Sequence, residues 1–319
     1  MGSISAEAKL PWIETPLISS PELSRAAGCN SNILLKLENL QPSGSFKSRG
    51  VGNLVLRAVA ASASADVHFY CSSGGNAGLA CATSAAALGL AATSGNANPE
   101  AQSKEGGGGS GRSSSRRPRA WTMPQLVRLS AAAGLVNGLL QGLEDVERDG
   151  GASAPWPRGR PPTVVAVETR GAESLHASVE AGRLVTLPAI TSIATSLGAV
   201  RVSERTWEWA RRKAVLGPRR QAEHGGRKMG PAGLESLVVS DAEAAMACVR
   251  FAHDARFVVE VACGATVAVC YNGALRETLG RGLSDDEWRR KNVVVVVCGG
   301  SNVSLEVLEE YKATYAHMV

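Results

Sequence analysis

The sequence predicts an α/β fold, because apolar runs with strand character alternate along the chain with segments of helical periodicity. Small residues or glycine follow the apolar runs, and helix-like segments come next. Continuous valine-rich strands separated by helices are typical of parallel sheets that are buried on both faces. The runs read as strands are ILLKL (33–37), VHFYC (67–71), TVVAVE (163–168), FVVEV (257–261) and VVVVVC (293–298).

Apolar positions recur at helical spacing in three longer segments, NAGLACATSAAALG (76–89), AESLHASVEAG (172–182) and DAEAAMACVRFAHD (241–254). Each of these segments is long enough for two or more helical turns. Their alternation with the apolar runs is what favours parallel strands joined by helices over an all-β fold.

Turns of small residues occupy positions where an open α/β sheet binds ligands, beyond the carboxyl ends of its strands. They are SSGGNAG (72–78), SAAAGLVNG (130–138), which precedes the helix-like LLQGLEDV, and CGGSNVS (298–304), which opens the last helix. Small residues let a ligand approach backbone N–H groups, and a helix N-terminus favours an anion. Each turn taken singly is also consistent with a tight strand-to-helix connection. The chain has no GxGxxG or P-loop pattern, which argues against a dinucleotide site.

Length and composition indicate a globular protein with a large core. The 319 residues suffice for two lobes, and the hydrophobic fraction is 44%. No apolar run reaches the roughly 18 residues of a membrane span, and MGSISAEAKLPW has no signal-peptide pattern. Seven cysteines without a CxxC pattern favour reduced thiols. We therefore expect a cytoplasmic protein with no membrane partner.

The net charge of +5 is concentrated in two tracts. Residues 211–230 carry seven Lys or Arg against one Glu, and residues 100–119 carry five against two Glu. A nucleic-acid surface would interleave aromatic residues with these charges, and neither tract contains Phe or Tyr. We expect loops or unfolded insertions here, and no nucleic-acid partner.

Four motifs occur in a fixed order: SGSFKSRG (43–50), SSGGNAG (72–78), VAVETRGAESLHAS (165–178) and VVVVVCGGSNVSLE (293–306). Together they resemble the fold-type II pyridoxal-phosphate (PLP) enzymes, and among these the L-serine dehydratases (serine ammonia-lyases) and threonine dehydratases. The resemblance covers roughly residues 10–90 and 130–319. It implies a fold like that of tryptophan synthase β, with two α/β lobes and mostly parallel sheets, the small lobe being truncated in this chain.

The resemblance implies that Lys47 is the catalytic residue, which carries the cofactor as a Schiff base and acts as general base. A lysine that is partly desolvated beside its cofactor favours the neutral amine, which is a nucleophile toward an aldehyde. Phe46 would pack its ring near the cofactor. The substrate carboxylate would be held by the loop Ser73, Gly74, Gly75 and Asn76, with the Asn76 amide also on the pyridine 3′-oxygen. A helix N-cap is the alternative role of Asn76.

Cys298, followed by Gly299, would place its thiol opposite the pyridine nitrogen. A cysteine after five valines is otherwise a small core residue. The resemblance assigns a cysteine at this position to serine dehydratases, which favours serine over threonine as substrate. Glu168, Ala172 and Ser174 match positions that supply oxygen ligands to a monovalent cation, K+. The alternative is that Glu168 caps the following helix or pairs with Arg170.

The chain departs from the family pattern in three places. The phosphate-binding loop has Ala131, Ala132, Ala133 and Gly134 in place of four glycines, and alanine is penalised where φ must be positive. Residues 91–129 are a low-complexity stretch that cannot bury a core. A basic insertion at about 213–232 interrupts segments that are neighbours in the family. We hypothesise that a misplaced splice junction and a retained intron produced these stretches. If residues 91–129 are instead a genuine part of the protein, we expect them to be disordered.

The resulting domain organisation has three parts. Residues 1–90 begin the large lobe and form a partial small lobe with Lys47 and the Asn76 loop, residues 91–129 are the low-complexity stretch, and residues 130–319 complete the large PLP-binding lobe. In the sequence, Lys47 and Asn76 thus precede residues 91–129, whereas Cys298 follows them.

The implied activity is β-elimination of L-serine to pyruvate and ammonia, and of L-threonine to 2-oxobutanoate, by a homodimer in amino-acid catabolism and gluconeogenesis. Two alternatives remain: an inactive relative, and a cysteine synthase-like enzyme. Cys298 and ETRGAESLHAS favour the dehydratase branch over cysteine synthase. The altered phosphate loop and the lost small-lobe segment favour the inactive relative.

Overall fold

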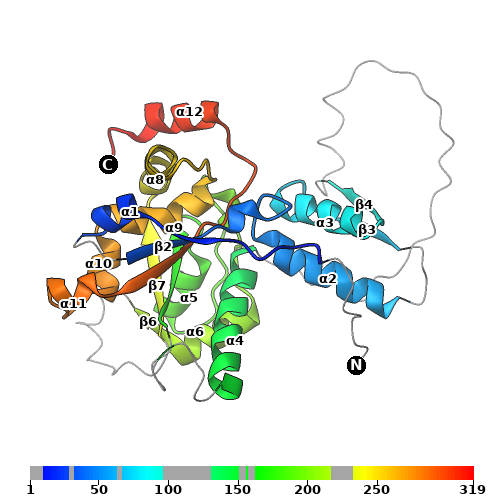
Figure 1. Cartoon of the computed structure of the whole chain (residues 1–319), viewed down its shortest axis with the longest axis horizontal. Helices are drawn as coiled ribbons and strands as arrows, with labels where there is room; N and C mark the ends of the chain where they lie inside the picture. Colours follow the sequence, from blue (N-terminus) through cyan, green and yellow to red (C-terminus); the bar gives the residue numbers. More distant parts are fainter. Residues whose placement is uncertain are drawn as a thin grey trace.

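The computed structural model of the protein describes residues 10–28, 32–62, 67–95, 131–150, 156, 162–216 and 233–319. Within these residues the strands form three sheets (Figure 1). The first has the order β1 (Leu17–Ser19), β2 (Asn32–Lys36) and β8 (Asn292–Val296). The second pairs β3 (His68–Cys71) with β4 (Ala91–Ser94), and the third has the order β5 (Val164–Thr169), β7 (Leu234–Val239) and β6 (Ala214–Leu216).

Parallel pairing dominates these sheets, as the sequence predicts. The pairs β2–β8, β3–β4, β5–β7 and β6–β7 are parallel, and only the pairing of β1 with β2 is antiparallel among the described strands. The first sheet joins the two ends of the chain, with Ile33 opposite Val293 and Leu35 opposite Val295. The α/β class is therefore confirmed.

Helices flank the sheets and contribute many of the buried side chains. Two short 3₁₀ helices are η1 (Glu38–Leu40) and η4 (Thr195–Leu197). The α-helices are α1 (Pro21–Ala26), α2 (Lys47–Ala61), α3 (Asn76–Ala87), α4 (Ala131–Gly150), α5 (Ser174–Ala181), α6 (Glu204–Lys213), α8 (Asp241–Ala255), α9 (Val261–Tyr271), α10 (Ala274–Leu279), α11 (Asp285–Arg289) and α12 (Leu305–Tyr315).

The large lobe has two clusters of buried apolar side chains. One gathers α8, α9 and the first sheet around Phe251, Trp288 and Ile33. The other fills the space between the third sheet and α4 to α6, around Trp209 and Leu234. Helices therefore cover this lobe on both sides, as buried parallel strands require.

The small lobe consists of α2, α3, β3 and β4, which lie apart from the other sheets (Figure 1). Helix α3 packs against both α2 and the β3–β4 pair. On the other face of this pair, His68 and Tyr70 are exposed and their rings stack with centroids 4.5 Å apart. Within the described residues, helices therefore cover only one face of this two-stranded sheet.

Some predicted elements differ from the structure. The strand predicted at FVVEV (257–261) is wrong, because residues 256–260 are an unpaired segment and Val261 begins α9. A short apolar run cannot be told from the start of a buried helix by its pattern. The helix predicted after SAAAGLVNG begins earlier, at Ala131.

Both stretches that depart from the family pattern contain short strands at their beginning. Strand β4 lies in the first residues of 91–129, and β6 in the first residues of the basic insertion. Residues 96–130 and 217–232 lie outside the described residues. Among the helices that the structure describes, none combines the length and the apolar character needed to cross a membrane.

Candidate active site

Lys47 is the first residue of α2, and the turn before it lies against the end of β8. The backbone N–H of Phe46 donates to the carbonyl of Cys298 over 3.1 Å. Gly299 has φ +80°, and a Cβ added there would lie 2.2 Å from the carbonyl oxygen of Gly44. Only glycine allows this approach of two backbones, which brings Lys47 and Cys298 to one place from distant parts of the chain.

A partly buried ion pair holds the start of α2. Arg49, two residues after Lys47, donates from Nε and Nη2 to the two carboxylate oxygens of Glu38, both over 2.7 Å. Although burial opposes ionisation, the hydrogen bonds from Arg49 and Thr15 lower the pKa of Glu38. The arginine of SGSFKSRG therefore anchors the helix that carries Lys47.

The surroundings of the Lys47 amine favour its neutral form. Burial lowers its pKa from 10.5 to about 8, and the nearby carboxylate of Glu260 opposes this shift in part. Its Nζ lies 5.4 Å from the centroid of the Phe46 ring. A substantial fraction of the amine is then neutral near physiological pH, as a nucleophile or a general base requires.

Asn76, at the start of α3, reaches across to the large lobe. Its Nδ2 donates to Glu260 Oε1 over 2.8 Å, and its Oδ1 accepts from the backbone N–H and the hydroxyl of Ser301 over 3.0 and 3.1 Å. The N-cap alternative for Asn76 is wrong, because Gly75 occupies the capping position and no side chain caps the helix. The Asn76 amide is therefore held by contacts between the two lobes.

The turn before α3 is compact. The N–H of Gly75 donates to Ser73 Oγ over 3.3 Å, and a Cβ added to Gly78 would lie 1.9 Å from the Ser73 carbonyl oxygen. The turn Ser73–Gly75 therefore lies directly on the first turn of α3, whose N–H groups point toward the turn. Its role in binding the substrate carboxylate stays a prediction.

Glu260 and Ser196 belong to the site but were not predicted from the sequence. Glu260 is 3% exposed, and its Oε2 accepts from Ser196 Oγ over 2.6 Å. The backbone N–H of Asn302 donates to Oε1 over 2.8 Å. A single carboxylate in the apolar FVVEVACG was the available signal, because a buried charge needs partners.

Cys298 is held as a neutral thiol. Its hydrogen bond with Cys263 and its burial raise its pKa well above the usual range, and the positive charge of Lys47 opposes this effect. Cys298 Sγ also lies 3.5 Å from the carbonyl oxygen of Val296. A neutral thiol is what the predicted position opposite a pyridine nitrogen requires.

Glu168 lies at the end of β5 and caps α5. Its two carboxylate oxygens accept from the backbone N–H groups of Leu175 and His176 over 3.0 and 2.8 Å. Burial raises its pKa to about 7. The capping alternative is therefore confirmed, whereas the cation role of Glu168, Ala172 and Ser174 stays a prediction.

No group of three or more His, Cys, Asp or Glu that could hold a metal occurs in the part of the chain that the structure describes. An alkali cation, which carbonyl oxygens can hold, is not covered by this observation.

The segment Ala131–Gly134 forms the first turn of α4. Helix α4 contacts α2, which carries Lys47, and η4, which carries Ser196. The first N–H groups of a helix have no partner within it. The role of Ala131, Ala132, Ala133 and Gly134 in binding a phosphate stays a prediction.

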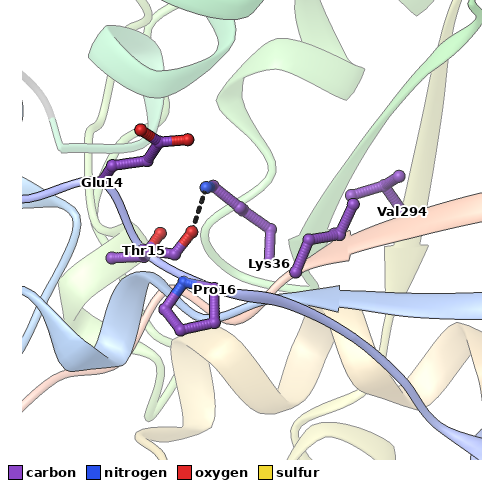
Figure 2. Close-up of a pocket in the computed structure, with 6 residues that line it drawn as sticks. Glu14, Thr15, Pro16, Lys36 and Val294 are labelled. Carbon is purple, nitrogen blue, oxygen red and sulfur yellow. Dashed lines mark hydrogen bonds between the residues drawn. The ribbon is translucent and has the colours of Figure 1, made fainter.

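A separate surface depression lies on the first sheet (Figure 2). There Lys36 Nζ donates to the carbonyl oxygen of Thr15 over 2.5 Å. None of the predicted site residues lines this depression, so it is separate from the candidate active site around Lys47. The depression is lined by Glu14, Thr15, Pro16, Leu17, Lys36 and Val294.

Known proteins resemble the chain over most of its length. The family "Pyridoxal-phosphate dependent enzyme" matches residues 9–95 and 129–299, so the match is interrupted within the low-complexity stretch. A serine dehydratase-like protein of Rattus norvegicus is 36% identical over 345 aligned positions, which cover 93% of both chains. An L-serine dehydratase/L-threonine deaminase of Bos taurus is 33% identical over 94% of both chains.

Among solved structures, the fungal L-serine ammonia-lyase of Rhizomucor miehei aligns with a TM-score of 0.68 and 27% identity. This alignment covers 96% of the present chain and all of the fungal one (100%). The two lobes, the lysine at the start of α2 and the sequence similarity thus indicate the same family. The chain belongs to the family of pyridoxal-phosphate dependent enzymes and has the fold of its fold-type II members.

Proposed function

We propose that the protein is a PLP-dependent L-serine ammonia-lyase, which converts L-serine to pyruvate and ammonia and also accepts L-threonine. The observation that carries the proposal is the meeting of Lys47, Asn76 and Cys298 where the two lobes touch. The relatives named for this activity are similar over more than nine tenths of the chain.

The residues present fit the cofactor. An aldehyde needs a neutral amine, which Lys47 supplies because burial lowers its pKa to about 8. The Asn76 amide would hold the pyridine 3′-oxygen, and the neutral Cys298 thiol with Gly299 would face the pyridine nitrogen. Phe46 would pack its ring near the cofactor, and the phosphate would lie at the first turn of α4, on backbone N–H groups of Ala131, Ala132, Ala133 and Gly134.

When bound, the cofactor supplies an electron sink that makes the α-hydrogen of the amino acid acidic. The Lys47 amine takes this proton as general base, and its pKa of about 8 suits the exchange near neutral pH. The turn Ser73, Gly74, Gly75 and the start of α3 bind the substrate carboxylate through backbone N–H groups. Cys298 stays a neutral thiol, so it does not compete for the proton.

The same proposal includes a K+ ion near Glu168, Ala172 and Ser174. Ala172 and Ser174 are 1% and 2% exposed, beside the buried Glu168 carboxylate. A cation there would favour the ionised carboxylate, which burial disfavours. A cytoplasmic homodimer that acts in amino-acid catabolism and gluconeogenesis completes the proposal.

A relative without activity is the second candidate. It is favoured by the alanines of the first turn of α4 and by the interruption of the family match between residues 95 and 129. Such a protein would keep the fold of the large lobe but bind the cofactor weakly or not at all. The two candidates therefore differ in a property that absorbance measures.

The test is the absorption spectrum of the purified protein with pyridoxal phosphate, before and after L-serine, with pyruvate assayed in parallel. We expect a visible cofactor band and pyruvate release, both lost in Lys47→Ala. Lys36→Ala is the matched control, because this lysine lies outside the site. Absence of the band from the unmodified protein would instead support the inactive relative.

A further inference from the structure

Glu260 is a buried carboxylate on which three separate segments converge. Asn76 Nδ2 donates to it from α3 over 2.8 Å, Ser196 Oγ from η4 over 2.6 Å, and the Asn302 N–H from the turn after β8 over 2.8 Å. At 3% exposure these hydrogen bonds take the place of water. The carboxylate therefore joins the small lobe to the large lobe beside Lys47.

The Asn76 amide lies between two partners of opposite polarity. Glu260 can only accept hydrogen bonds, and the backbone N–H of Ser301, which donates to Asn76 Oδ1 over 3.0 Å, can only donate. A flipped amide would bring oxygen against oxygen and N–H against N–H, and a buried polar group that loses its hydrogen bond is costly. Only one orientation of the amide is thus stable.

The carboxylate itself has little freedom to move. Glu260 is the N-cap residue of α9, and Val261, the first residue of that helix, is buried. Gly300 has φ +118°, and a Cβ added there would lie 2.1 Å from Glu260 Cδ. The backbone at Gly300 therefore packs directly on the carboxyl group of Glu260.

We propose that Glu260 is a positioning residue that orients the Asn76 amide so that an N–H, rather than the carbonyl, faces the bound cofactor. An amide nitrogen carries two hydrogens, and Glu260 takes one of them, which leaves the second for the cofactor oxygen. This inference rests on the proposed function, because it assigns Asn76 to the cofactor.

Glu260 also acts on Lys47 through its charge, since its negative charge opposes the effect of burial on the amine. The effect of the length of the Glu260 side chain must therefore be measured separately from the effect of its charge. Glu260→Gln keeps the length and an acceptor oxygen for Asn76 but removes the charge. Glu260→Asp keeps the charge but withdraws the carboxylate from Asn76 by one methylene.

The experiment measures the dissociation constant of pyridoxal phosphate by fluorescence titration, and the wavelength of the visible band, at a pH above 9. At this pH the Lys47 amine is neutral in each variant, so its charge no longer differs. We expect Glu260→Asp and Asn76→Ala each to weaken binding roughly 10-fold or more, which corresponds to about 1.4 kcal/mol. Glu260→Gln should stay within about threefold of the unmodified protein.

A double-mutant cycle completes the test. The variant with both Glu260→Asp and Asn76→Ala should bind no more weakly than the weaker single variant, because both changes remove the same contact. Additive losses, or weak binding by Glu260→Gln with normal binding by Glu260→Asp, would overturn the assignment. Failure of the unmodified protein to bind the cofactor would instead reject the proposed function, and the inference with it.

Discussion

At the scale of single residues, the chemistry of the site comes from the surroundings of Lys47. A lysine at a helix start is usually solvated and charged. Here burial destabilises the ammonium form more than the Glu260 carboxylate stabilises it, so the pKa of Lys47 is lowered. Cys298 is shifted in the opposite direction and stays protonated. The site thus holds an amine that loses its proton at a moderate pH beside a neutral thiol, which suits an aldehyde cofactor.

This balance predicts the pH at which Lys47 becomes reactive. In the cofactor-free protein, labelling of Lys47 by an amine reagent should rise with pH to a midpoint near 8, because its pKa is lowered to about 8. Mass spectrometry of the labelled peptide gives the rate, and Glu260→Gln should move the midpoint lower. A midpoint near the reference value of about 10.4 would contradict the prediction.

Residue roles could be predicted only where a motif carries them. Lys47 and Asn76 stand in short motifs, so the sequence indicated both. Glu260 was missed because its partner Asn76 lies 184 residues away and because its segment was taken for a strand. Contacts over such separations depend on the packing of the lobes, which no local pattern encodes.

At the scale of elements, the functional side chains lie where strands end and helices begin. Glu168 shows the consequence, because it ends β5 and accepts from the first N–H groups of α5. The helix N-terminus favours its ionised form, but burial outweighs this effect and raises its pKa to about 7. Its protonation is therefore coupled to folding.

Glu168 should make the protein less stable as the pH rises. Its pKa is raised from 4.5 to about 7, so its contribution to the free energy of unfolding is complete below pH 4.5 and is lost as the pH rises through 7. The loss is of the order of 3 kcal/mol. The difference between the unmodified protein and Glu168→Gln in urea unfolding from pH 4 to 8 measures it. A difference that does not vary with pH would refute this.

Potassium should counteract this loss if it binds where we propose. A cation beside Glu168 stabilises the carboxylate, so KCl should raise the Tm at pH 8 more than at pH 5. Choline chloride at equal ionic strength is the control for screening. The response should vanish in Glu168→Gln, and an equal response in that variant would place the ion elsewhere.

The packing of α9 on α8 depends on one glycine. A Cβ added to Gly264 would lie 2.3 Å from the Ala244 carbonyl oxygen and 2.4 Å from Cys248 Sγ. Gly264→Ala should therefore lower the free energy of unfolding by about 1–3 kcal/mol. Gly138→Ala in α4 is the matched control, because nothing lies within 4 Å of the added Cβ, and it should be neutral or slightly stabilising. Equal losses in denaturant unfolding would contradict this.

Elements with a clear apolar pattern could be predicted from the sequence, but α2, with 15 residues, and β7, with six, were not predicted, and neither were two shorter strands. Helix α8 and strand β5 follow their predicted ranges closely, whereas β4 and β6, with four and three residues, were not predicted as strands. Each forms by pairing with a neighbour, β4 with β3 and β6 with β7. Tertiary pairing rather than local propensity therefore determines these strands.

At the scale of the whole molecule, the two lobes differ in how much they bury. Trp209, Trp288 and Phe251 are fully buried in the large lobe, whereas Val55 is the largest fully buried side chain in the described part of the small lobe. Lys47 and Asn76 lie on the small lobe, and Glu260 and Cys298 on the large one. The site is therefore complete only while the small lobe is docked.

Hydrogen exchange should reveal this difference. Amides of α3 and β3 should exchange through openings of lower free energy than those of α9, because few large apolar side chains hold the small lobe together. Adding pyridoxal phosphate should slow exchange in the first turns of α2 and α3, since the ligand bridges both lobes and stabilises only the docked state. Exchange in α8 serves as the internal control. Equal protection of α3 and α9 without ligand would show that the small lobe is as stable as the large one and that docking does not limit the site.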